Sequence, residues 1–323
     1  MRVPSGRKSE MRAATVVDGR IEVREHPDPQ PGYGQLLVKV RAAGLNGADM
    51  IQVKGGYPAP PGAPQDIPGL ELAGEVAALG PGATRFKEGD RVMAVVGGGG
   101  QAELAVVHER EAMPVPAGLD WSEAGGLPEV FTTAHDALFT QAALRMGERL
   151  LVHGAAGGVG TAGVQLGIAA GAMVTASVRN AEMRERVAGL GATVIDPADT
   201  VDAGPYDVIL ELVGAPNLDA NLRSLATGGR IAVIGTGAGA KGEINLGLLM
   251  VKRARIHGST LRARPLEGKA AAARLVETQV LPLFASGRLR VPVDCTFPLE
   301  DAAAAYERFG GGAKFGKVVI RCD

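Results

Sequence analysis

Two hydrophobic patterns divide the chain near Trp121. Before that residue, short apolar runs are bounded by Gly, Pro and Asp, which is typical of strands joined by turns. The runs lie at residues 35–42, 72–79 and 91–96. The segment 27–31 contains three prolines and belongs in a linker or at a sheet edge, because proline cannot donate to a central ladder. The first part of the chain is therefore predicted to be β-rich.

After Trp121, helical stretches alternate with short strands that are almost wholly apolar. The expected strands are 149–153, 173–177, 193–196, 207–212, 230–234 and 255–260, and the expected helices are 158–170, 181–190 and 216–226. Continuous apolar strands separated by helices predict a parallel sheet that is buried on both faces. Six such strands complete a doubly wound nucleotide-binding unit.

The last 60 or so residues return to a mixed pattern, with a helical stretch over 266–286 and short strands near 291–294 and 317–321. We predict a discontinuous arrangement. Residues 1–128 and 263–323 would build one β-rich domain, and residues 129–262 would form the doubly wound (Rossmann) domain inserted between them. A chain of 323 residues is long enough for two such cores.

A glycine-rich turn between the first strand and helix of the second pattern predicts a phosphate site. The residues GAAGGVG at 154–160 follow an apolar strand and open a helix. Glycine lets the backbone approach a pyrophosphate, and the helix N-terminus offers free N–H groups to the anion. The expected contacts are Ala156, Gly157, Gly158, Val159 and Gly160.

The end of the second strand indicates which dinucleotide binds. An NAD site usually has Asp or Glu there, whereas this chain has no acidic residue before Glu182. Ser177 and Arg179 could hold the 2′-phosphate of NADPH, which a carboxylate would repel. The alternative is that Arg179 is an ordinary solvated residue. We predict NADPH as the cofactor.

Composition excludes several other classes of protein. The net charge of -1, without a run of Lys and Arg, indicates neither nucleic acid nor an anionic membrane as a partner. No apolar stretch has the length of a membrane span, and the first ten residues lack the apolar region of a secretory signal. We expect residues 1–10 to be a flexible tail or an alternative start before Met11. Two cysteines cannot build a disulfide scaffold, which fits the cytoplasm.

Several phrases resemble zinc-independent, zeta-crystallin-like quinone oxidoreductases of the medium-chain dehydrogenase/reductase superfamily. They are AAGLNGADMIQVKGGYP at 42–58, PGLELAGEVAALGPGATRFKEGDRV at 68–92, GLPEVFTTAHDAL at 126–138, GAAGGVG at 154–160 and AKFGKVVI at 313–320. The resemblance implies a GroES-like catalytic domain beside the nucleotide domain, with the active cleft between the two. It also implies homodimers formed by edge strands of the nucleotide domains, here 255–260.

Zinc-dependent relatives hold their catalytic metal with Cys, His and Cys. At the matching positions this chain has Asn46, Leu70 and Glu129. Leucine cannot bind a metal, asparagine is a poor ligand, and one carboxylate cannot hold zinc alone. We therefore expect no metal site. Without zinc to polarise an alcohol, reduction of a conjugated acceptor is favoured.

The resemblance also assigns residues to the pocket. Asn46 and Tyr57 match positions that line the nicotinamide and the acceptor, and Thr133 matches a hydroxyl near the carboxamide. Ile234, Gly235 and Thr236 follow the fifth strand and Leu261 follows the sixth, at the edge of the sheet where ligands bind. Asp49 and Glu71 could be read as an acid/base pair, but structural roles are favoured for both.

The leading hypothesis is reduction of a quinone by hydride transfer from NADPH, with Tyr57 or solvent supplying protons. One alternative is a reductase for enones or 2-enoyl thioesters, in which Tyr57 would be the proton donor. A second alternative is a non-catalytic protein that only binds NADPH.

Overall fold

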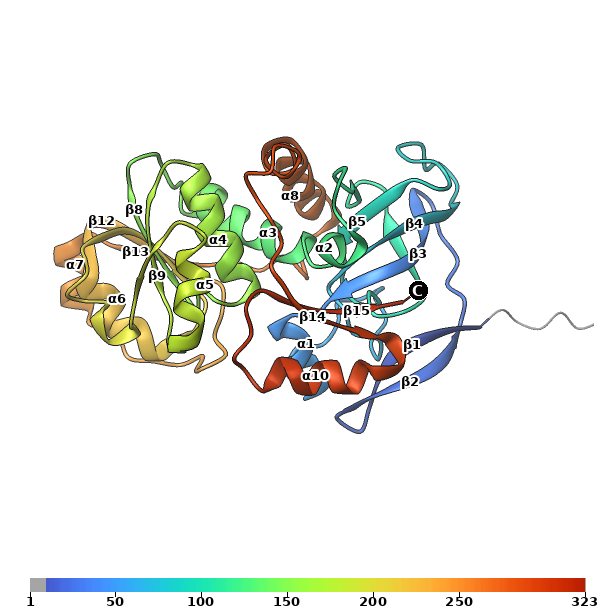
Figure 1. Cartoon of the computed structure of the whole chain (residues 1–323), viewed down its shortest axis with the longest axis horizontal. Coiled ribbons are helices and arrows are strands. Elements are labelled where there is room, and N and C mark those ends of the chain that lie inside the picture. The colour runs from blue at the N-terminus through green and yellow to red at the C-terminus, as the bar shows by residue number, and fades with distance from the viewer. Residues whose placement is uncertain (1–9, 323) are drawn as a thin grey trace, which may run out of the picture.

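The computed structural model describes residues 10–322 and shows two regions side by side, each built on its own sheet (Figure 1). The tail predicted over 1–10 lies outside the described residues, except for Glu10, which begins the first strand. In the part of the chain that is described, no helix is both long and apolar enough to cross a membrane.

The first region contains a hairpin and a seven-stranded sheet. The hairpin pairs β1 (Glu10–Val17) with β2 (Arg20–Pro27). The sheet has the order β14-β15-β3-β4-β5-β7, with β6 also paired to β3. Its strands are β3 (Gln35–Gly44), β4 (Glu71–Leu79), β5 (Arg91–Val95), β6 (Leu104–His108), β7 (Met113–Pro114), β14 (Val293–Pro298) and β15 (Lys317–Arg321).

The end of the chain completes this first sheet. Strand β15 is antiparallel to β3, with Val319 opposite Gly44, and β14 is parallel to β15. The helices of this region are α1 (Gly47–Val53), α2 (Trp121–Gly125) and α10 (Ala302–Gly310), preceded by the 3-10 turn η5 (Leu299–Asp301). The pairing of β15 with β3 supports the predicted discontinuous domain, whose exact boundaries remain a prediction.

The second region is a six-stranded parallel sheet with the order β10-β9-β8-β11-β12-β13. Its strands are β8 (Arg149–His153), β9 (Met173–Ser177), β10 (Thr193–Ile195), β11 (Tyr206–Glu211), β12 (Leu225–Val233) and β13 (Arg255–Gly258). The helices are α4 (Gly158–Ala169), α5 (Arg184–Ala188), α6 (Leu218–Ser224) and α7 (Leu246–Lys252), with 3-10 turns η2 (Ala181–Met183), η3 (Pro197–Asp199) and η4 (Ala215–Asn217). This order is that of a doubly wound dinucleotide-binding fold, as predicted.

Some predicted boundaries were wrong. The helix expected over 266–286 is two helices, α8 (Leu266–Gln279) and α9 (Leu281–Ala285). Pro282 lacks an N–H and crowds the preceding turn, so one continuous helix cannot pass through it. Strand β12 begins at Leu225 rather than Arg230, and the helix expected to reach 226 stops at Ser224.

Helix α3 (Pro128–His135) and the π-helical turn η1 (Asp136–Gln141) join the two regions. One hydrophobic cluster runs from Met93 of the first sheet through Phe131 of α3 to Val152 of the second sheet. Phe131 also packs edge-on against Phe284 of α9, with ring centroids 4.8 Å apart. This shared core fixes how the residues of the first sheet lie against the glycine-rich turn.

Candidate active site

The glycine-rich turn has the geometry of an anion site. Helix α4 begins after Gly157, and neither a side-chain cap nor an acidic residue occupies its first turn. The first N–H groups of a helix have no partner within the helix, so these can receive a phosphate group. A Cβ at Gly160 would lie 2.3 Å from the carbonyl oxygen of Gly154, so only glycine allows the turn to close. Ala156, Gly158 and Val159 complete this turn.

The end of β9 lies next to this turn. Ser177 is buried, and its carbonyl oxygen accepts a hydrogen bond from the N–H of Ala155. Arg179 lies two residues farther along and is exposed, with no hydrogen bond or ion pair to any residue in 10–322. The guanidinium of Arg179 is therefore available to a ligand.

Two more predicted segments lie at the same edge of the sheet, where parallel strands end. Ile234, Gly235 and Thr236 follow β12, and a Cβ at Gly235 would come within 2.3 Å of the Leu212 carbonyl oxygen. Leu261 is buried just beyond β13. Their backbone groups and the glycine-rich turn thus share the ligand-binding edge of a doubly wound sheet.

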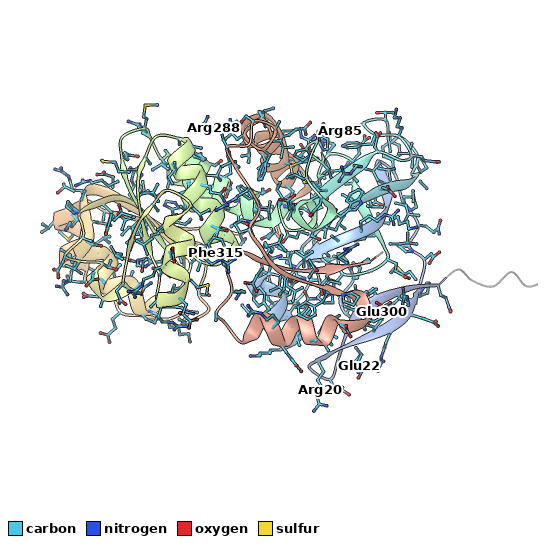
Figure 2. The ribbon with its side chains drawn as sticks, in the orientation of Figure 1. Arg20, Glu22, Arg85, Arg288, Glu300 and Phe315 are labelled. Atoms are coloured by element: carbon cyan, nitrogen blue, oxygen red, sulfur yellow. The ribbon has the colours of Figure 1, made fainter. Side chains whose placement is uncertain are left out.

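The returning chain brings the first sheet to this turn. The N–H of Gly316 donates to the carbonyl oxygen of Ala156 at 2.8 Å. A Cβ at Gly158 would lie 2.9 Å from Cδ of Lys317, so the lysine stem passes against the turn. Phe315, labelled near the junction in Figure 2, stacks under the guanidinium of Arg186 from α5 at 4.4 Å. These contacts place Lys317 between the two regions.

Lys317 is buried and lies at the centre of a polar network. Its ammonium donates to Oδ1 of Asn46 at 2.8 Å and to the carbonyl oxygen of Leu45 at 2.6 Å, and it forms an ion pair of 2.6 Å with Glu71. The amide nitrogen of Asn46 in turn donates to Oε1 of Glu71 at 2.9 Å. Both ends of the Asn46 side chain are therefore held. Lys317 was not predicted from the sequence as a site residue, although it lies in the phrase AKFGKVVI.

Two further carboxyl groups adjoin the network. Asp49 accepts hydrogen bonds from the N–H groups of Asn46 and Gly69, at 2.8 and 3.1 Å, and burial raises its pKa to about 6. It caps α1, which is the structural role favoured above. Glu71 likewise accepts from the N–H of Glu129 at 2.8 Å, in addition to its contact with Lys317.

Glu129 differs from the other two acids. Burial, and then the charge of Glu71, raises the pKa of Glu129 to about 8. Its Oε1 accepts a hydrogen bond from Thr133 at 3.2 Å, while its buried Oε2 has no hydrogen-bond partner within the described chain. Because a buried oxygen without a partner disfavours the charged form, the protonated form of Glu129 is favoured at neutral pH.

Tyr57 is held by Arg262. The buried guanidinium of Arg262 donates to the carbonyl oxygens of Tyr57 and Gly97 and to the side-chain oxygen of Gln52, at 2.8, 2.7 and 2.5 Å. It also lies 4.9 Å from the centre of the Tyr57 ring. Burial raises the pKa of Tyr57, and its hydroxyl makes no hydrogen bond to other described residues. The phenol is therefore a protonated, unengaged donor.

The residues that replace metal ligands do not suit a cation. Leu70 has no donor atom, and the oxygen of Asn46 already faces the Lys317 ammonium. Over residues 10–322 no group of three or more His, Cys, Asp and Glu side chains is arranged to hold a metal ion. A divalent cation beside Asn46 would meet the like charge of Lys317.

Comparisons with known proteins agree with this architecture. Residues 32–117 match the family described as the alcohol dehydrogenase GroES-like domain, and residues 172–320 match the family described as zinc-binding dehydrogenase. The quinone oxidoreductase of Rattus norvegicus is 33% identical over 90% of both chains. A mycocerosic acid synthase-like polyketide synthase of Mycobacterium tuberculosis is 31% identical over 98% of this chain but only 16% of its own length.

Among solved structures, an alcohol dehydrogenase superfamily protein from Novosphingobium aromaticivorans superposes with a TM-score of 0.87. It is 31% identical, and the match covers 97% of this chain and 100% of that one. Fold, domain matches and full-length relatives therefore agree. The chain belongs to the medium-chain dehydrogenase/reductase superfamily of NAD(P)-dependent oxidoreductases.

Proposed function

We propose that this protein reduces quinones by hydride transfer from NADPH without a metal ion. The observation that carries the proposal is the buried Lys317, whose ammonium lies 2.8 Å from the side-chain oxygen of Asn46 and 2.6 Å from Glu71, in the place that a metal ion would need. Two further observations support it. Full-length relatives are named quinone oxidoreductases, and an unpaired Arg179 follows β9 where an NAD enzyme would carry an acid.

In this proposal each part of the site has a separate task. The N–H groups of α4 bind the pyrophosphate, and Ser177 with Arg179 binds the 2′-phosphate. Backbone groups of 234–236 and 261, with the hydroxyl of Thr133, hold the nicotinamide half. When bound, NADPH supplies the hydride.

Asn46, fixed by Lys317 and Glu71, forms one wall of the acceptor pocket, and Tyr57 forms the other. The hydride and one proton convert the quinone to its hydroquinone, and the phenol of Tyr57 or solvent delivers the proton. The phenol of Tyr57 is protonated at neutral pH, and burial raises its pKa further. Cytoplasmic residence is part of the same proposal and fits a chain with only two cysteines.

A second candidate is reduction of an enone or a 2-enoyl thioester. The polyketide synthase relative, which matches almost the whole chain, favours it. In that reaction the hydride goes to the β-carbon and the proton to the α-carbon, so a protonated Tyr57 would be needed at each turnover. The third possibility, an NADPH-binding protein without catalysis, would show cofactor binding and no turnover.

The variant Tyr57→Phe separates the candidates. Removing a general acid lowers the rate by about 10²–10⁴-fold. In an enone reductase, Tyr57→Phe should lower enone turnover by that factor. In a quinone reductase that takes its proton from solvent, the same variant should change quinone turnover little. The matched control is Tyr33→Phe, because Tyr33 is 81% exposed and remote from the network. NADPH oxidation is measured for each protein with a quinone, an enone and an enoyl thioester.

Strong enone turnover that Tyr57→Phe abolishes would overturn the quinone proposal and support the second candidate. Binding of NADPH without oxidation by any acceptor would contradict both candidates.

A further inference from the structure

A cavity of about 360 Å³ lies at the opposite end of the parallel sheet from the glycine-rich turn. Its wall includes Glu148, which precedes β8, residues 228 and 230 of β12, residues 255 and 257 of β13, and Gln141 at the end of η1. The glycine-rich turn follows the other end of β8. Because β8 has five residues, the two places are separated by about 16 Å of strand. The cavity is therefore distinct from the nucleotide site.

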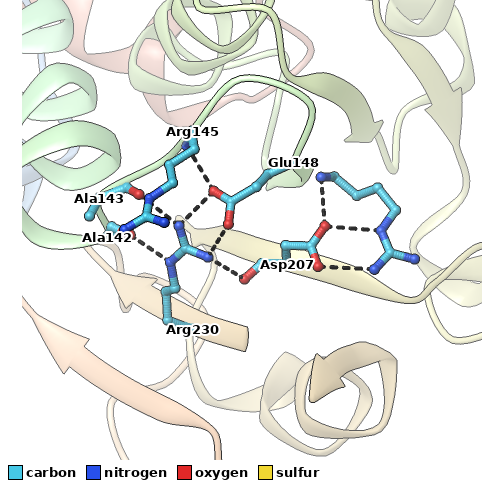
Figure 3. A network of polar contacts seen from close by, with 7 residues as sticks. Ala142, Ala143, Arg145, Glu148, Asp207 and Arg230 are labelled. Carbon is cyan, nitrogen blue, oxygen red and sulfur yellow. Dashed lines mark hydrogen bonds and ion pairs between the residues drawn. The ribbon is translucent and has the colours of Figure 1, made fainter. Parts of the chain in front are cut away.

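The acids around this cavity are already neutralised. Both oxygens of Glu148 accept hydrogen bonds from Arg230, each at 2.7 Å, and Arg230 also donates to the carbonyl oxygens of Ala142 and Ala143 (Figure 3). The neighbouring Asp207 accepts three hydrogen bonds from Arg149. This network leaves neither carboxylate available to balance another cation.

Two arginines of the wall remain uncompensated. Arg145 and Arg255 line the cavity, and their guanidinium groups have no hydrogen bond or ion pair among the residues that the structure describes. Figure 3 shows Arg145 beside the Arg230–Glu148 pair. The wall thus carries two guanidinium groups, and all of their N–H donors remain available to a ligand. Guanidinium groups of this kind match the oxygens of a phosphate.

His257 adds a third polar group. It lines the same cavity, and its Nε2 is buried without a hydrogen-bond partner in the described chain. Burial and the charges of Arg255 and Arg230 lower the pKa of His257, so the ring is neutral and retains one N–H. Arg255 and His257 alternate with Ile256 along β13, which directs their side chains to the same face of the sheet. A buried polar atom without a partner is unfavourable unless a ligand engages it.

We propose that this cavity binds a phosphate monoester of a small metabolite, with Arg145 and Arg255 holding the phosphate and His257 completing its contacts. The volume supports an ester over free phosphate, because cavities of roughly 300–1,000 Å³ hold small organic ligands. The site is separate from the proposed reaction and does not depend on it.

The test is calorimetric titration of the full chain with inorganic phosphate and, separately, with glycerol phosphate. Saturating NADPH is present so that the nucleotide site is closed to both, and ionic strength is held constant with chloride. The double variant Arg145→Gln/Arg255→Gln removes both charges. The control is Arg20→Gln, an exposed arginine at the tip of the β1–β2 hairpin (Figure 2). Since none of these side chains has a hydrogen bond or ion pair to another residue of 10–322, each variant should keep the unfolding temperature of the parent.

We expect glycerol phosphate to bind more tightly than inorganic phosphate, and the double variant to weaken both by roughly tenfold or more, because hydrogen bonds to charged groups contribute about 1.5–3 kcal/mol. Arg20→Gln should change neither. Equal binding by the double variant and the parent, or no binding to the NADPH-saturated parent, would overturn the assignment. Tighter binding of inorganic phosphate would overturn the preference for an ester.

Discussion

Arg179 is the side chain on which the choice between the two nicotinamide nucleotides depends. It is exposed and without a partner in the described chain, and it lies two residues after the buried Ser177, whose carbonyl oxygen accepts a hydrogen bond from Ala155 of the glycine-rich turn. A guanidinium offers parallel donors to a 2′-phosphate and little to a ribose hydroxyl. Selectivity for NADPH should therefore depend on this one charge.

Replacing Arg179 with Gln should raise the dissociation constant for NADPH by about tenfold or more and leave that for NADH within about twofold. Fluorescence titration of the two nucleotides measures the change. Arg253→Gln is the matched control. Arg253 is also an exposed arginine of the second region, but it follows α7 and belongs to none of the segments proposed to bind the nucleotide. An equal loss of affinity for both nucleotides would show that Arg179 does not select between them.

Glu129 makes the stability of the protein depend on pH. Its pKa of about 8 in the folded state exceeds the usual 4.5, so the folded protein binds this proton more tightly than the unfolded chain does. The stabilisation is complete at pH values below the unfolded pKa and is lost as the pH rises through about 8. The carboxyl group therefore destabilises the fold in alkaline solution.

The variant Glu129→Gln keeps the shape of the side chain and removes the titration. Between about pH 6 and about pH 9, the free energy of unfolding should fall by roughly 1–2 kcal/mol more in the parent than in Glu129→Gln. Urea unfolding at several pH values measures this difference. The exposed Glu25→Gln serves as control, and a pH dependence as steep in Glu129→Gln as in the parent would contradict the assignment of Glu129.

At the scale of elements, the sequence predicts strands better than helix ends. Strands 149–153, 173–177 and 317–321 begin and end at the predicted residues, because each is a short apolar run between turn residues. The helix over 266–286 was predicted too long, since its apolar periodicity continues through Pro282 although the backbone cannot. Periodicity reports which face is buried, and it says little about where hydrogen bonding stops.

The glycine-rich turn could be predicted because all its parts are adjacent in sequence. The network around Asn46 could not, because its partners come from distant segments. Lys317 is 271 residues from Asn46, and Arg262 is 205 residues from Tyr57. The pairing of β15 with β3 brings Lys317 to Asn46, and the segment that follows β13 brings Arg262 to Tyr57. From the sequence, Asn46 and Tyr57 could be assigned only because short phrases resemble those of a known family. That resemblance does not explain how the two side chains are oriented.

At the scale of the whole molecule, β13 is an edge strand of the six-stranded sheet. The neighbouring α7 exposes three large apolar side chains, with Leu246 61%, Met250 75% and Val251 78% exposed. An unpaired strand edge beside an apolar surface favours association with another chain. We propose that two copies pair there to form a homodimer.

The variant Val251→Asp should convert the dimer to a monomer or weaken it by at least about tenfold, because the interface would then bury an unpaired charge. Light scattering after size-exclusion chromatography, over a range of protein concentrations, gives the mass. Met146→Asp is the control, since Met146 is 82% exposed and lies outside α7 and β13. A dimer that persists in Val251→Asp would place the interface elsewhere, and a monomeric parent would exclude the pairing.

We propose that the ammonium of Lys317, rather than a metal ion, is the cation beside Asn46 in an NADPH-dependent reductase of quinones. The most direct test follows NADPH oxidation by absorbance with a quinone as acceptor, before and after incubation with a strong metal chelator, and repeats the assay with NADH. We predict turnover that prefers NADPH and keeps its full rate after chelation. Loss of activity on chelation that zinc restores would contradict the account, as would the absence of quinone turnover.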